Sequence, residues 1–270
     1  MESEASTFTG NGLTNWNTLV AAVNCSSAAS HIACVRTVNG SVIEDIISRQ
    51  ALDFAPVADN ITSTNDISHQ LNGMTAAHIP ILIGTNAGEG RVFAFGQSNV
   101  TAYVDTTFPA SLQQEVLAAY PATESGYFTI SDILTQVGFQ CPAQSIADLA
   151  TKDGYNVWRY YFNASFPNFQ PFGPDSGVFH SSEIPEVFGT YLTANATAQQ
   201  IALSKYMQTA WADFAKDPAA GPGWSKVGNG TNDVADIGGN GSDAAHLIDP
   251  ATIDKNCAIY DPLFTYFLGL

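Results

Sequence analysis

One buried strand followed directly by a glycine-rich turn constrains the fold of this 270-residue chain most strongly. Residues 78–85 read HIPILIGT, a continuous apolar run with β-branched residues, and Asn-Ala-Gly-Glu-Gly follows. A run without alternating polar positions is typical of a strand covered on both faces, as in a parallel sheet. Parallel strands need crossover connections, so the chain is predicted to place helices between its strands.

The rest of the chain fits this prediction, because helical and extended patterns alternate along it. A second strand is predicted at residues 156–162 (NVWRYYF), and helices are predicted at 13–38 (two, with a Ser-rich interruption), 111–120, 130–136, 142–152, 197–216 and 261–270. The Pro-, Asn- and Ser-rich residues 53–73 indicate an extended connection, and the Gly-, Asn- and Asp-rich residues 217–254 indicate a long surface loop. The pattern favours an α/β fold with right-handed crossovers.

The charge balance excludes two classes of partner. Asp and Glu outnumber Lys and Arg by 25 to 9, which gives a net charge of -16. Such a surface repels phosphate backbones and anionic lipid, so we expect neither nucleic acid nor a membrane surface as a partner. No apolar run approaches the roughly 20 residues of a membrane span, so stable membrane insertion is not expected.

Other features indicate an extracellular protein. Asn-X-Ser/Thr, the acceptor motif for N-glycosylation, occurs at Asn24, Asn39, Asn60, Asn99, Asn163, Asn195, Asn229 and Asn240. An acidic chain with these sequons and an even number of cysteines is typical of secreted proteins. The N-terminal MESEASTF has no basic or apolar region of a signal peptide, so we expect that the chain is incomplete.

The four cysteines are Cys25, Cys34, Cys141 and Cys257, and they allow three disulfide pairings. Cys25 with Cys34 would close a small loop and leave Cys141 with Cys257 to close a very large one. Four reduced, buried cysteines are the alternative. No Cys-X-X-Cys or paired-histidine spacing occurs, so no zinc site is predicted.

Candidate chemistry lies in two loops that follow the predicted strands. Glu89 lies between glycines that permit a tight turn after the first strand, and His180 follows the second strand at some distance. Ligand sites in parallel sheets gather at the carboxyl ends of strands. An acid followed by a histidine matches the last two members of the hydrolase order nucleophile, acid, histidine. A carboxylate against one imidazole nitrogen fixes the tautomer and leaves the other nitrogen free to accept a serine proton.

Simpler interpretations of these residues are also consistent with the sequence. Glu89 fits a solvated turn residue, and His180 fits a neighbour of a helix cap made by Ser181 or Ser182. His180 and Glu183, three residues apart, resemble a metal-binding pair, but no third ligand is evident. The segment GTNAGEG lacks the Lys-Ser/Thr ending of a phosphate loop.

The sequence lacks the motifs of a serine nucleophile. Gly-X-Ser-X-Gly does not occur; Gly96-Gln-Ser-Asn-Val100 approaches it and lacks the final glycine. No HGG-type oxyanion segment occurs either.

The order of several segments resembles the C-terminal half of type-B carboxylesterases, the α/β-hydrolase group that includes cholinesterases and fungal secreted lipases. IPILIGTNAGEGRVF resembles the acid loop, VGFQCPAQ and VWRYYFNASFPN the next helix and strand, and GVFHSSEIPEVFG the histidine loop. MQTAWADFAKDPAAGPGW and CAIYDPLF resemble the late helix and the C-terminal cysteine segment. The resemblance covers nearly all of the chain. It implies that residues 1–270 form one partial α/β-hydrolase domain, with late parallel strands and crossover helices but without the early strands.

The resemblance also implies roles for individual residues. Glu89 aligns with the triad acid and His180 with the triad base, while Ser3 and Glu183 align with residues that support them. Val92 and Phe93 align with positions that line the substrate pocket, although ordinary packing explains them equally well. The pairs Cys25–Cys34 and Cys141–Cys257 fall on two disulfides of the family.

By this resemblance the chain is part of a secreted serine carboxylic-ester hydrolase that needs no cofactor or metal and acts on small-molecule or lipid esters. The chain alone is expected to be inactive and to depend on the missing N-terminal half of its domain, which would carry the serine. A non-catalytic secreted binding or adhesion module of the same fold is the alternative. Such modules often lose the acid or the histidine, and this chain keeps both.

Overall fold

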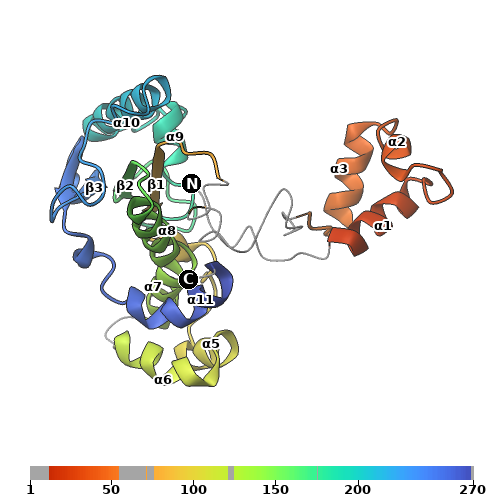
Figure 1. Cartoon of the computed structure of the whole chain (residues 1–270), viewed down its shortest axis with the longest axis horizontal. Coiled ribbons are helices and arrows are strands. Elements are labelled where there is room, and N and C mark those ends of the chain that lie inside the picture. The colour runs from red at the N-terminus through yellow and green to blue at the C-terminus, as the bar shows by residue number, and fades with distance from the viewer. Residues whose placement is uncertain (1–11, 55–70, 72–75, 121–124, 175, 269–270) are drawn as a thin grey trace. The chain divides into compact units, whose positions relative to one another are not determined.

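The computed structural model describes residues 12–54, 71, 76–120, 125–174 and 176–268, with side chains described up to residue 264 (Figure 1). These residues fall into two compact units. Residues 12–54 belong to the smaller unit, and the described residues from 71 onward belong to the larger one. That all 270 residues form one partial hydrolase domain stays a prediction.

The smaller unit consists of three helices, α1 (Gly12–Ala22), α2 (His31–Val35) and α3 (Gly40–Arg49). A disulfide joins Cys25 to Cys34. Val20, Cys25 and Val35 form its small buried core. The first two helices confirm the prediction for this segment; α3 was not predicted, although Asn39 caps it by accepting a hydrogen bond from the Ser41 amide.

The larger unit contains a four-stranded mixed sheet in the order β1-β2-β3-β4. Strands β1 (Ile81–Asn86), β2 (Val157–Phe162) and β3 (Val234–Ile237) are parallel, and β4 (Ala245–Ile248) is antiparallel to β3. This arrangement confirms the predicted α/β class. Within the described part of the chain β1 pairs only with β2, so β1 is an edge strand of this sheet.

The prediction of a surface loop at residues 217–254 is wrong, because this segment supplies β3 and β4. All four residues of β3 are buried. The strand escaped detection because it is short and contains Asp236 within its apolar run. Asp236 faces His246 across the β3–β4 pair, and its Oδ2 lies 3.1 Å from the His246 Nε2. This neighbour on the next strand accounts for an acidic residue within the sheet.

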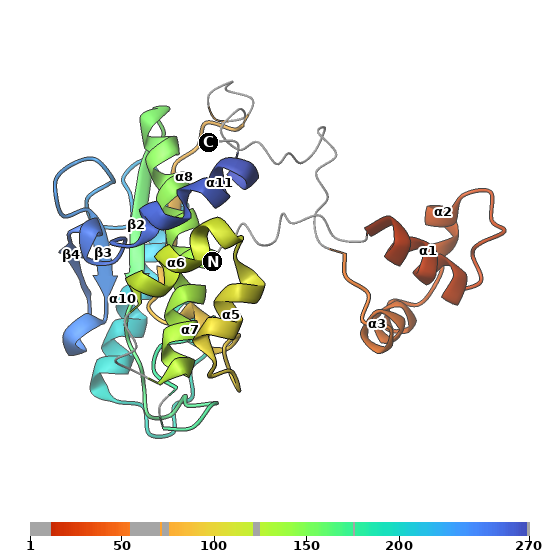
Figure 2. The same ribbon diagram turned by 90° about the horizontal axis from the view of Figure 1, so that it is seen from below.

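Helices surround the sheet (Figures 1 and 2). Alternate residues of β2 face opposite ways: Val157 packs with α8 (Cys141–Lys152), whereas Tyr160 and Phe162 pack with α10 (Ala198–Lys216). The two helices therefore cover opposite faces, as expected for a parallel sheet. The other helices, η denoting a 3-10 or π helix, are η2 (Glu89–Arg91), α5 (Val100–Thr107), α6 (Ala110–Ala119), α7 (Gly126–Thr135), η3 (Gln136–Gln140), α9 (Ile184–Phe188), η4 (Gly239–Gly241), η5 (Pro250–Thr252), η6 (Cys257–Tyr260) and α11 (Asp261–Leu268).

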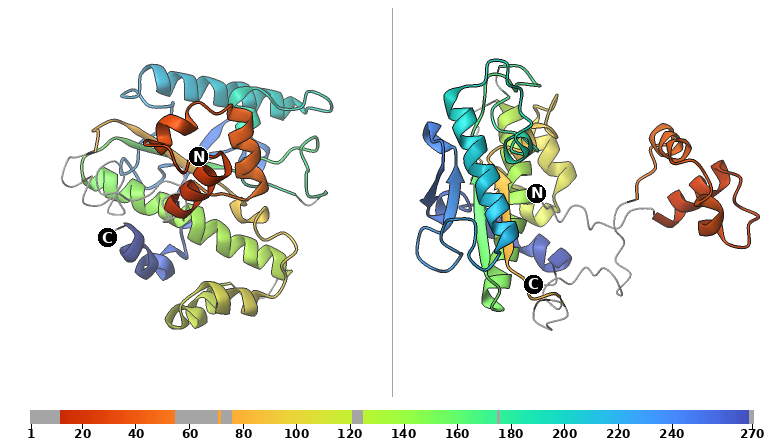
Figure 3. Two further views of the ribbon diagram at one scale, coloured as in Figure 1. Left: turned by 90° about the vertical axis from the view of Figure 1, so that its right-hand side faces the viewer. Right: turned by 90° about the horizontal axis from the view of Figure 1, so that it is seen from above.

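A π-helical turn, η3, joins α7 to α8, and Figure 3 shows these two helices in line. The disulfide Cys141–Cys257 ties the start of α8 to the C-terminal segment. This disulfide belongs to a core that includes Val104, Ile133 and Tyr260. In the part of the chain that the structure describes, none of the helices combines the length and apolarity needed to cross a bilayer.

Candidate active site

The first component of the site is Glu89, which begins the short helix η2 directly after β1. Its side chain is 0 % exposed, so the simpler reading of a solvated turn residue is wrong. The backbone N–H of Asn86 donates a hydrogen bond of 2.8 Å to Glu89 Oε1. A buried carboxylate needs such partners, because its desolvation costs several kcal/mol.

The glycines beside Glu89 are required by close approach and not by an unusual backbone angle. Gly88 has a φ of -134°, which any residue adopts. A Cβ on Gly88 would lie 2.2 Å from the Val178 carbonyl oxygen, and one on Gly90 would lie 2.0 Å from that of Ser131. The sequence analysis attributed these glycines to a tight turn. The structure shows that they let the histidine loop and α7 approach the acid loop.

The second component, His180, lies in the turn between β2 and α9. The Phe179 ring anchors this turn, because it packs against Phe169 and Phe172 with centroids 5.1 and 5.5 Å away. Ser181 follows with a φ of 71°, in the left-handed region that residues other than glycine rarely adopt. The histidine therefore lies in a turn that is anchored by one buried ring, Phe179, and two half-buried ones.

The serines after His180 do not cap α9, contrary to the simpler reading. Glu183 occupies the N-cap position of α9, and no side chain caps the helix. The Ser182 hydroxyl instead accepts a hydrogen bond from the Phe179 backbone N–H. Ser182 thus closes the histidine turn rather than the helix.

Glu89 and His180 meet although 91 residues separate them: Glu89 Oε2 lies 2.7 Å from His180 Nδ1. The carboxylate is an acceptor, so the ring donates its Nδ1 proton, which leaves Nε2 as the acceptor nitrogen. The hydrogen bond to Glu89 raises the pKa of His180 above its ordinary value, while partial burial opposes this effect. With 31 % of its side chain exposed, His180 is accessible to a reactant.

A second carboxylate, Glu183, lies close to this pair and is 3 % exposed. Its Oε2 accepts a hydrogen bond from the Asn86 side chain. Burial raises the pKa of Glu183, and the hydrogen bond from Asn86 acts in the opposite direction. The metal-binding reading of His180 and Glu183 gains no support, because the described residues contain no cluster of three potential metal ligands.

Two aromatic rings, which also stack on each other, pack against His180. The ring centroids of Phe93 and Phe139 lie 5.3 and 5.1 Å from the imidazole, and Phe93 is 47 % exposed. The resemblance predicted both Val92 and Phe93 as pocket residues; Val92 is half-buried. Phe139 was missed; it lies in the π-helical turn η3, a feature that often marks functional sites.

The remaining predicted residues are Ser3 and the glycosylation sequons, and one residue of the site, Asn86, was missed. Ser3 and Asn60 lie outside the described residues. Of the other sequons, Asn163 is half-buried, and the exposed ones are Asn24, Asn39, Asn99, Asn195, Asn229 and Asn240. Asn86 was not predicted. Its position directly after a buried apolar run was the available signal, because a buried polar side chain requires hydrogen-bond partners.

Comparison with known proteins shows which family the sequence matches. The family model described as "Carboxylesterase family" matches residues 5–251. Secreted lipase 5 of Gibberella zeae is 30 % identical over 192 residues, which cover 65 % of this chain and 31 % of that protein. The chlorogenic acid esterase of Aspergillus niger is 28 % identical over 224 residues, which cover 80 % of this chain and 39 % of the relative.

A bacterial relative, the para-nitrobenzyl esterase of Bacillus subtilis, is 30 % identical over 178 residues, or 61 % of this chain and 35 % of the relative. The matched region thus spans between 31 and 39 % of the length of these three relatives. The family match extends over most of the sequence, including the loops that hold Glu89 and His180. The chain belongs to the carboxylesterase family.

Proposed function

We propose that this chain supplies the acid and the base of the catalytic triad of a serine carboxylic-ester hydrolase. The 2.7 Å contact between Glu89 Oε2 and His180 Nδ1 carries this proposal. A buried carboxylate against one nitrogen of a partly exposed imidazole is the arrangement that activates a serine hydroxyl. The names of the relatives, which include lipases and esterases, support the same reaction class.

The geometry assigns a role to each residue. His180 Nε2 would accept the proton of a serine as its oxygen attacks the ester carbonyl, and would return it to the leaving alcohol. Glu89 would hold the ring in the required tautomer and stabilise the imidazolium. Glu183 and Ser3 would support this pair. Val92 and Phe93 would contact the ester, and the Phe139 ring packs against both the imidazole and Phe93.

The serine is the component that this sequence does not offer in the expected motif, since Gly-X-Ser-X-Gly is absent from the 270 residues. We propose that the serine belongs to an N-terminal part of the same hydrolase domain and that the 270 residues alone do not turn over esters. The three relatives are matched over only 31 to 39 % of their own length, which is compatible with a further segment of the domain. No metal or organic cofactor enters the proposed reaction.

The proposed setting is extracellular. Both disulfides are consistent with an oxidising compartment. The exposed sequons are positioned for glycosylation, and two relatives are named secreted lipases, from Gibberella zeae and Botryotinia fuckeliana. A small or lipid-like ester is the proposed substrate class.

The test joins this chain to an N-terminal segment of a carboxylesterase that carries Gly-X-Ser-X-Gly, and measures hydrolysis of a p-nitrophenyl ester. We expect His180→Gln and Glu89→Gln to lower kcat/KM by about 10⁶-fold and 10⁴-fold, because members of a triad act as a unit. His246→Gln is the matched control, since His246 also pairs with a carboxylate, that of Asp236, on β3.

The outcomes separate the alternatives. Activity that survives His180→Gln in the joined protein would refute the triad assignment and favour the non-catalytic binding module. Labelling of the unjoined 270-residue chain by a serine-directed fluorophosphonate would refute the proposal that its nucleophile lies elsewhere.

A further inference from the structure

The last residue of β1, Asn86, occupies an unusual position for an amide side chain. It is 0 % exposed, and it pairs in register with Phe162, the last residue of β2. A buried amide costs stability unless its donors find acceptors. What it contacts therefore indicates why an amide is tolerated there.

Asn86 contacts all three parts of the site. Its backbone N–H donates to Glu89 Oε1 over 2.8 Å. Its side-chain Nδ2 donates to the Phe179 carbonyl oxygen over 2.9 Å and also to Glu183 Oε2. Phe179 immediately precedes His180, so one residue links the acid, the backbone of the histidine turn and the second carboxylate.

The two oxygens of Glu89 accept from different donors. Oε1 accepts from the Asn86 backbone N–H, and Oε2 accepts from His180 Nδ1. The side-chain amide meanwhile holds the backbone from which His180 projects. Both groups of the 2.7 Å pair are thus fixed from the same residue.

The amide also affects the charge near His180. Its hydrogen bond favours the ionised form of Glu183 and so opposes the effect of burial on the pKa of that carboxyl. An ionised Glu183 in turn raises the pKa of His180, in addition to the larger effect of Glu89. Loss of the amide would therefore weaken the effect of Glu183 and loosen the contact with Glu89, and both changes would lower the pKa of His180.

We propose that Asn86 is a positioning residue of this site, whose side-chain amide couples Glu183 and the histidine turn to the Glu89–His180 pair. The proposal rests on the proposed function, because it assigns Asn86 a part in preparing the base. It concerns the side chain alone, since the backbone hydrogen bond to Glu89 is available to any residue except proline.

The experiment titrates His180 by ¹⁵N-histidine NMR in the purified 270-residue chain, with His180→Gln to assign its signal among the five histidines. Asn86→Ala keeps the backbone donor and removes the amide. We expect the titration midpoint of His180 to fall, because Glu183 loses a donor that favours its ionised form and the histidine turn loses a hydrogen bond to β1. The low-field Nδ1 proton signal should broaden as well.

Gln200→Ala is the matched control. Gln200 is also 0 % exposed and donates to a buried carboxylate, Glu186, over 2.9 Å, but it lies in α10 and contacts neither Glu89 nor His180. We expect this variant to lose comparable stability and to leave the His180 midpoint unchanged. A His180 midpoint that is the same in wild type and Asn86→Ala would overturn the proposal.

Two further measurements keep the outcomes distinct. A wild-type His180 without a raised midpoint would refute the Glu89–His180 pair itself, and hence the proposed function. If Asn86→Ala does not fold, Asn86→Ser replaces it, because the hydroxyl can donate to only one of the two acceptors. An unchanged His180 midpoint in that variant overturns the role of Asn86 as well.

Discussion

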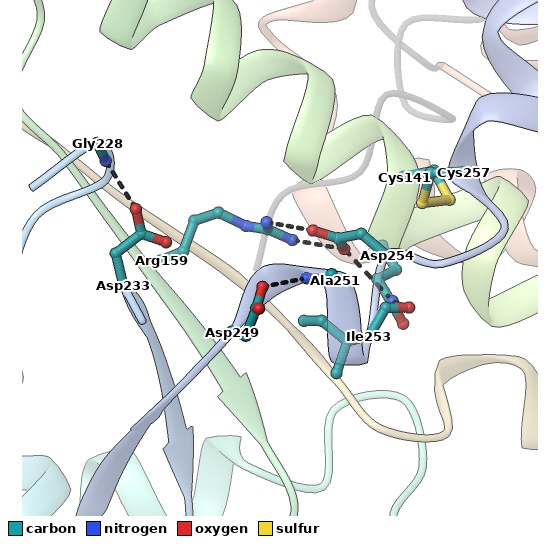
Figure 4. A network of polar contacts seen from close by, with 10 residues as sticks. Cys141, Arg159, Gly228, Asp233, Asp249, Ala251, Ile253, Asp254 and Cys257 are labelled. Atoms are coloured by element: carbon teal, nitrogen blue, oxygen red, sulfur yellow. Dashed lines mark hydrogen bonds and ion pairs between the residues drawn. A yellow bond between two sulfur atoms is a disulfide. The ribbon is translucent and has the colours of Figure 1, made fainter. Parts of the chain in front are cut away.

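The buried ion pair between Arg159 and Asp254 offers the sharpest test of how this fold is held together. Arg159 projects from β2, and its Nη1 and Nη2 lie 2.7 and 3.1 Å from the two carboxylate oxygens of Asp254 (Figure 4). Their side chains are 4 % and 3 % exposed. Gln140, at the end of the π-helical turn, donates to the adjacent Ile253 carbonyl. The pair therefore connects the central sheet to the segment that precedes Cys257.

The expected magnitudes follow from burial and charge. Removing one partner of a buried pair leaves an uncompensated charge and costs about 3 to 5 kcal/mol. The cost of Arg159→Met should lie at the upper end of this range. Arg159 also stabilises the ionised form of Asp148, whose pKa is raised by burial and by the nearby charges of Asp254 and Asp233. Asp254→Asn should fall near the lower end, since the amide oxygen still accepts one hydrogen bond. A double replacement, Arg159→Met with Asp254→Leu, should cost less than Arg159→Met alone.

Urea unfolding of the purified chain, followed by tryptophan fluorescence, measures these differences; one of the four tryptophans, the buried Trp158, precedes Arg159 on β2. Lys216→Met is the control in the same unit, since Lys216 and Asp213 form an exposed pair at 3.5 Å. It should change the free energy of unfolding by less than about 1 kcal/mol. A cost for Arg159→Met no larger than that of the control would refute the reasoning that this pair is shielded from water.

Three other perturbations test separate features. Replacing Cys141 and Cys257 by serine should lower the free energy of unfolding by about 4 to 5 kcal/mol in calorimetry, against about 2 to 3 kcal/mol for Cys25 and Cys34, because their sequence separations are 116 and 9. Burial raises the pKa of Glu186, so its ionisation opposes folding and stability is lost as pH rises through the raised value. Glu186→Gln should therefore melt higher than wild type at neutral pH, and the difference should vanish in acid. Gly88→Ala should abolish the raised His180 titration midpoint, because its Cβ would meet the Val178 carbonyl at 2.2 Å, whereas Gly230→Ala meets no atom within 4 Å and should not.

The fold could be predicted where local patterns are long and unmixed. The apolar run that became β1 and the periodic stripe of α10 were read correctly from sequence. Strand β3 could not be, since it has four residues and one is Asp236. Its acidic residue is compensated by His246 opposite on β4 and by hydrogen bonds from Asn163 and Gly239, neighbours that the sequence pattern does not show.

Some residues of the site could likewise be predicted from the sequence, and others could not. Glu89 and His180 could be located because each follows a recognisable strand, and the resemblance named them. Asn86 and Phe139 could not be located, because their roles depend on contacts with segments distant in sequence. The hydrogen bond from Asn86 to Phe179, for example, joins residues 93 positions apart. The sequence analysis attributed Gly88 to a tight turn for the same reason: the carbonyl that excludes a Cβ at this position belongs to Val178, which is distant in sequence.

The register of β1 and β2 explains why these distant contacts converge. Asn86 and Phe162 end their strands side by side, so the two loops start from neighbouring points. The loops then touch at two places: the backbone of Gly88 lies close to the Val178 carbonyl, and the Asn86 side-chain amide donates to the Phe179 carbonyl. The approach of Gly88 to Val178 tolerates little displacement because no side chain lies between the two backbones, and the Asn86 amide is fully buried. The Glu89–His180 distance is therefore set mainly by the ends of two parallel strands, and we infer that substitutions elsewhere on the loops alter this site less than changes at Asn86 or Gly88.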